Sequence, residues 1–216
     1  LSHLRILLRE DNTTLQPLQE LARATPCLRR LTLTYDVHPF RTWGPRNMDA
    51  LGNMETVEEL ELGGLDYGDA MCMHALSCMK SVRVLTLCRM PMNHPIIGKL
   101  AALPRLRCLR LTELESRSSP SDHDTLPLFD ALTPLRDIQD LEMSVDTSCT
   151  LPRNAFSCLS VMTGLRSLCL RDIMMTRGVE DIRLISRLQR LESLQLDIRE
   201  KSLSDVVHPM LDGIGS

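Results

Sequence analysis

The sequence predicts an α/β solenoid of about eight repeats, with parallel strands on a concave face and helices or helical turns on a convex face. Three observations support this prediction: a motif that recurs along the chain, a two-residue periodicity inside the motif, and a three-residue periodicity between its copies. Self-similarity of this kind is typical of proteins in which one small unit is stacked many times.

The recurring motif is Leu-x-x-Leu-x-Leu, with Val or Ile allowed at its first position and Ile or Met at its sixth. Its copies follow one another at intervals of 24 to 32 residues. Eight copies begin at Leu1, Leu28, Val57, Val82, Leu106, Ile138, Leu165 and Leu191. Motif positions are numbered from these residues. Because the copies run throughout, we expect one array over residues 1–216. Residue 1 already lies inside a repeat, so we expect a piece of a longer chain.

Each motif copy has the periodicity of a β-strand. In the second copy, Leu31 and Leu33 alternate with Arg30, Thr32 and Thr34. Successive side chains of a strand point to opposite faces, so the leucines are expected to point inward and the polar residues outward. One short strand per repeat follows from this pattern.

Between motif copies the spacing of apolar residues changes to that of a helix or helical turn. The clearest stripe is Ile97, Leu100, Leu103 and Leu106, and a second is Ala75, Cys78 and Val82. We expect these segments to cover the inward side of the strands. Gly178 and Val179 are interpreted as a loop.

The motif and its repetition resemble the leucine-rich repeat superfamily over nearly the whole chain. That family commonly has Asn or Cys at the ninth position of each repeat. Here the ninth positions are Arg9, Asp36, Leu65, Met90, Leu114, Asp146, Ile173 and Arg199. The sequence is therefore more similar to the irregular, helix-containing intracellular repeats, such as those of F-box proteins and nucleotide-binding immune receptors.

Composition limits the classes of partner. The net charge is −3 and the pI about 6.1, whereas a nucleic-acid-binding domain is usually basic, so nucleic acid is an unlikely partner. Only three of the 25 basic residues are Lys, and this arginine surplus supports the alternative of a ribonucleoprotein scaffold. No apolar run reaches about 18 residues, so we expect no membrane-spanning helix.

The eight cysteines are scattered through the repeats, which favours reduced thiols and a cytoplasmic or nuclear location. Cys72, His74 and Cys78 lack the second ligand pair of a structural zinc site. The run from Asp122 to Asp124, with a central histidine, lies in a loop-like segment that is poorly suited to positioning catalytic groups. We expect no enzyme activity, no metal, no cofactor and no small-molecule substrate.

Two regions are candidates for binding a protein partner. The first is the predicted concave face, with Arg30, Thr32, Glu59, Glu61, Thr86, Arg110, Glu142 and Arg171. Its centre carries less charge than its surroundings, an arrangement that is typical of protein-binding surfaces but also occurs without any function. The second is the loop with Phe40 and Trp43, where an exposed Trp would be a binding anchor. Alternatively, Trp43 folds back over the edge of the array.

These observations favour a non-catalytic protein-recognition module. The resemblance to F-box proteins implies a ubiquitination substrate as the partner, and that to immune receptors implies a ligand or an autoinhibitory domain. The alternative is a structural scaffold subunit of a multiprotein or ribonucleoprotein assembly.

Overall fold

The structure is a computed structural model of the 216-residue chain. It describes residues 1–8, 20, 23–35, 51–64, 76–90, 96–114, 126–145, 150–151, 154–175 and 179–200. The Phe40 and Trp43 loop lies outside the described residues, as do Cys72, His74 and the 122–124 segment.

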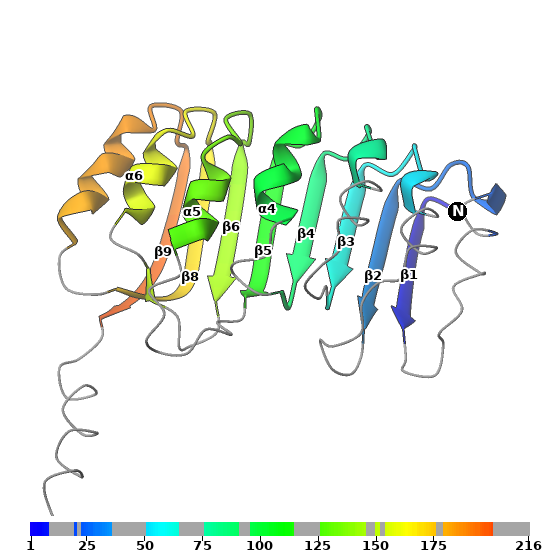
Figure 1. The fold of residues 1–216 in the computed structure, drawn as a ribbon, viewed down its shortest axis with the longest axis horizontal. Coiled ribbons are helices and arrows are strands. Elements are labelled where there is room, and N and C mark those ends of the chain that lie inside the picture. Colours follow the sequence, from blue (N-terminus) through cyan, green and yellow to red (C-terminus); the bar gives the residue numbers. More distant parts are fainter. Residues whose placement is uncertain are drawn as a thin grey trace, which may run out of the picture.

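One parallel β-sheet runs through the described part of the chain (Figure 1). Its strands are β1 (His3–Leu8), β2 (Arg30–Tyr35), β3 (Glu59–Gly63), β4 (Val84–Cys88), β5 (Cys108–Leu114), β6 (Asp140–Val145), β7 (Thr150–Leu151), β8 (Ser167–Met175) and β9 (Ser193–Glu200). All strands except the short β7 follow one another across the sheet in chain order. The prediction of an α/β array with one parallel strand per motif copy is confirmed.

The motif sets the register of the sheet. A strand begins at motif position 3 in every copy, and residues at the same motif position pair across neighbouring strands. Leu31 pairs with Leu60, and Leu60 pairs with Leu85. Because the side-chain alternation stays in phase from strand to strand, all of the motif leucines reach the same side of the sheet.

β7 was not predicted from the motif. It pairs with the far end of β8, where Thr150 lies beside Met174. β6 pairs with the beginning of β8, and β9 pairs with both parts of it. β7 therefore extends the line of β6 along the same edge of β8.

Short helices form a second layer against the sheet (Figure 1). They are α4 (Ile96–Lys99), η1 (Leu100–Ala102), α5 (Leu126–Leu132), α6 (Ala155–Ser160) and η2 (Val179–Arg187). Their apolar side chains and the motif leucines form one continuous buried core, in which Phe129 is fully buried. The expected loop at Gly178 and Val179 is wrong at Val179, where η2 begins.

A pair of turns connects the helical layer to each of β3, β4, β5, β6, β8 and β9. The amide of Val82 donates to the carbonyl of Met79, and the amide of Met79 donates to that of Leu76. Residues three and six positions before the strand motif are therefore buried. For this reason the expected stripe through Cys78 is wrong by one residue: Leu76 and Met79 are buried, while Cys78 is partly exposed.

Candidate functional site

The open face is defined here as the side of the sheet opposite the described helices, and it carries the side chains at motif positions 3, 5 and 7. Charged and polar residues dominate it because the motif reserves positions 4 and 6 for the core. Seven gaps of about 4.8 Å separate its eight main strands, so the face is roughly 34 Å across. A surface of this breadth suits a macromolecule better than a small molecule.

A hollow of about 540 Å³ lies on the open face over β1 to β5, and we call it the face hollow. Its lining consists of His3, Arg5, Arg30, Leu31, Thr32, Glu59, Leu60, Glu61, Val84, Thr86 and Arg110. Six of the residues predicted from the sequence therefore come together here. Their neighbourhood follows from the register, which pairs Arg30 with Glu59 and Glu61 with Thr86 across adjacent strands.

Opposite charges meet across neighbouring strands inside the face hollow. Arg30 forms an ion pair with Glu59, and both side chains remain partly exposed. The hydrogen bond from Arg30 lowers the pKa of Glu59, while partial burial opposes this effect. Glu59 is therefore a carboxylate at neutral pH and a weak general base. Thr32 is buried and donates a hydrogen bond of 3.1 Å to Glu61.

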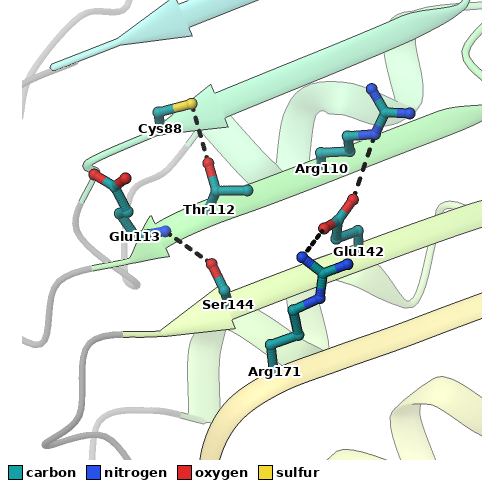
Figure 2. Close-up of polar contacts among 7 residues, drawn as sticks. All are labelled: Cys88, Arg110, Thr112, Glu113, Glu142, Ser144 and Arg171. Atoms are coloured by element: carbon teal, nitrogen blue, oxygen red, sulfur yellow. Dashed lines mark hydrogen bonds and ion pairs between the residues drawn. The ribbon is translucent and has the colours of Figure 1, made fainter. Parts of the chain in front are cut away.

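A second charge cluster lies farther along the open face. Glu142 on β6 forms ion pairs with Arg110 on β5, at 3.5 Å, and with Arg171 on β8, at 3.2 Å. Figure 2 shows the carboxylate between the two guanidinium groups, each contacting a different oxygen. Arg110 belongs to both the face hollow and this cluster, so the two groups of predicted residues are continuous.

Between these charges the open face is less polar. Thr112 donates to the Cys88 sulfur at 3.0 Å, as Figure 2 shows, and Cys108 is only 8% exposed. Burial raises the pKa of both thiols. They therefore remain protonated at neutral pH, which makes them poor nucleophiles but suitable small, weakly polar contacts.

Left-handed backbone conformations recur directly after motif position 7 in four repeats. Gly64, Arg89, Glu113 and Asp172 all have positive φ, and all occupy motif position 8. The amide of Gly64 donates to Cys88 and that of Arg89 to Thr112, both at 3.0 Å. This feature was not predicted from the sequence, because only one of the four residues is a glycine.

A second hollow, of about 620 Å³, lies at the sheet edge where β5, β6, β8 and β9 begin. We call it the arginine hollow. Its lining consists of Arg107, Arg136, Asp137, Gln139, Thr163, Gly164, Arg166, Arg187, Gln189 and Arg190. The arginine surplus is visible in the sequence, but its gathering at this edge is not. Arginines in or just before motif position 2 of successive copies were the available signal.

No known protein family matches the chain, and no curated protein matches it significantly. Within the described ranges, no helix is long and apolar enough to cross a membrane. The same ranges contain no group of three or more side chains that could hold a metal ion. The six cysteines that the structure describes are free thiols.

Proposed function

We propose that the chain is a non-catalytic protein-recognition module of the leucine-rich repeat type, which binds a protein partner through its open face. The observation that carries this proposal is the face hollow, in which charged side chains from consecutive strands surround Val84 and Thr86. A weakly polar centre with a charged rim is the common anatomy of a protein interface.

The size of the face supports a protein partner. Specific interfaces bury about 800 Å² on each side, and the face hollow with the Glu142 cluster extends over β1 to β8. The ion pairs are partly exposed, so a partner can compete for Arg30, Arg110 or Arg171 without first opening the core.

The chemistry of the face supports binding rather than catalysis. The lowered pKa of Glu59 and the raised pKa values of Cys88 and Cys108 move these groups away from roles as base and nucleophile. We also propose that the chain acts inside the cell, where it recognises a substrate or ligand as part of a larger protein.

The test is affinity capture from native lysate with the parent chain and the Glu61→Arg/Arg110→Glu variant, followed by mass spectrometry. A matched control is Glu55→Arg/Lys99→Glu, which preserves net charge in the same way at two exposed residues outside the face hollow. We expect one reproducible protein to be lost from the face variant and retained by the control, with folding checked by circular dichroism.

A Trp43→Ala variant separates the loop from the open face as the binding region. If the captured proteins survive both the face and the Trp43 changes, recognition through either region is wrong. A scaffold subunit that contacts its assembly through other surfaces then becomes the better proposal.

A further inference from the structure

The arginine hollow concentrates positive charge without balancing it. Its lining contains five arginines and a single carboxylate, that of Asp137. Arg166 forms an ion pair of 3.3 Å with Glu192. In contrast, Arg136, Arg187 and Arg190 form no ion pair with any carboxylate in the described part of the chain.

The repeat architecture fixes the positions from which these arginines extend. The carbonyl of Arg107 accepts hydrogen bonds from the amides of Gln139 and Asp140, and the carbonyl of Gln139 accepts those of Arg166 and Ser167. The side chains at motif position 2 consequently form a row along one edge, with neighbours about 4.8 Å apart.

Tight backbone packing lies beneath this row. A Cβ atom added at Gly164 would lie 2.5 Å from the carbonyl oxygen of Arg136. The glycine is therefore required by the close approach of two turns. Around it, Gln139, Thr163 and Gln189 supply neutral hydrogen-bonding groups between the arginines.

We propose that the arginine hollow binds an acidic, extended segment of a protein partner, rich in Asp and Glu. Guanidinium groups match carboxylates with paired hydrogen bonds, and side-chain amides can bond a peptide backbone. The hollow spans three strand gaps, or roughly 14 Å, which is the length of four or five extended residues.

A protein segment fits this surface better than a nucleic acid does. Binding of single strands without sequence preference depends on aromatic side chains that stack on bases, and the lining contains none. Charge complementarity is local to the hollow.

The proposal is tested by fluorescence anisotropy on the 216-residue chain. The probe is a fluorescein-labelled octapeptide of alternating Asp and Glu, compared with its Asn and Gln counterpart and with a labelled uridylate octamer. We expect the acidic peptide to bind, the amide peptide to bind much more weakly, and added salt to weaken binding. Arg136→Gln/Arg190→Gln should weaken binding of the acidic peptide about tenfold or more.

The matched control is Arg23→Gln/Lys99→Gln, which removes two positive charges from exposed residues outside the hollow. It should change the affinity less than about twofold. An equal loss in the control, or equal binding of the acidic and amide peptides, would overturn the proposal. Tighter, hollow-dependent binding of the uridylate octamer would replace the peptide with a nucleic acid.

This proposal is independent of recognition through the open face. The Glu61→Arg/Arg110→Glu variant alters the face hollow and leaves the arginine hollow intact. It should therefore bind the acidic peptide as the parent chain does.

Discussion

The face hollow and the arginine hollow belong to the same sheet but balance their charges differently. On the open face, Arg30 has Glu59 on the next strand, and Arg110 and Arg171 share Glu142. At the strand-start edge, Arg136 and Arg190 have no such neighbour among the described residues. The repeat brings equivalent positions together, so the sequence at each position decides whether neighbouring charges cancel or add.

This difference bears on partner choice more than on stability. An exposed ion pair contributes about 0–1 kcal/mol to folding. A partner approaching the open face meets arginines that are already paired with carboxylates, and it must replace those carboxylates with its own. A partner approaching the arginine hollow meets Arg136, Arg187 and Arg190, which have no ion pair among the described residues. The two surfaces are therefore suited to different ligands.

The largest expected effect on stability comes from Gly164→Ala, which disrupts the backbone packing beneath the arginine hollow. The new methyl would meet the Arg136 carbonyl at 2.5 Å, closer than contact allows. We expect a loss of about 1–3 kcal/mol in unfolding free energy, measured by urea denaturation.

Two glycines serve as controls for this substitution. Gly63→Ala on the open face comes closest to the Thr34 methyl, at 3.1 Å, and its contacts with the rest of Thr34 are ordinary. A small shift of that side chain can relieve the contact, so its cost should be below about 1 kcal/mol. Gly98→Ala in α4 has ordinary contacts and should be neutral or stabilising. Equal urea midpoints for Gly164→Ala and Gly63→Ala would refute the close-approach argument.

The second prediction removes the shared carboxylate of the open face. Glu142→Gln leaves Arg110 and Arg171 on either side of a neutral residue, so we expect a loss of about 1 kcal/mol. Arg136→Gln in the arginine hollow should cost nothing, since it relieves repulsion between like charges. Urea denaturation of both variants measures the contrast. Equal losses would show that charge balance does not distinguish the two hollows.

The sequence predicted the strands well because the motif encodes them directly. Every main strand begins at motif position 3, and the face residues from Arg30 to Arg171 lie in neighbouring rows as expected. The helical layer was harder to predict, as the one-residue error at Cys78 shows, because two consecutive turns, rather than a regular helix, set the buried positions.

The arginine hollow was missed for a different reason. Arg107 and Arg166 occupy motif position 2, whereas Arg136, Arg187 and Arg190 lie in or before the turns. Only the folded register brings these separate segments to one edge. The alternation of side chains within each strand predicts which residues lie on the open face. It does not predict where the side chains at the beginnings of the strands gather.

The third prediction uses pH to probe the pairing of Glu59. Its pKa in the folded chain is lowered by the hydrogen bond from Arg30. A lowered pKa contributes stability that is present above the unfolded value, near 4.5, and is lost as the pH falls through the folded value. Glu59→Gln should therefore reduce the slope of stability against pH below about 4.5. An unchanged slope in acid denaturation would show that this pair contributes nothing.

The smallest expected effect on stability comes from a substitution that increases the excess of positive charge in the arginine hollow. Glu192→Gln releases Arg166 from its one described carboxylate partner. All five arginines of the hollow, rather than four, then lack an ion pair among the described residues, and Arg107 keeps its hydrogen bond to the Leu106 carbonyl. Because the pair is exposed, stability should change by less than about 0.5 kcal/mol.

Affinity should respond where stability does not. We expect Glu192→Gln to strengthen binding of the acidic octapeptide about twofold to threefold, because the released guanidinium can contact the peptide and a competing carboxylate is removed. Glu55→Gln, at an exposed residue outside the hollow, removes the same charge and should leave the affinity unchanged. If both variants strengthen binding equally, net charge governs the interaction. If only Glu192→Gln raises the affinity, the binding depends on the local charge imbalance that distinguishes the arginine hollow from the face hollow.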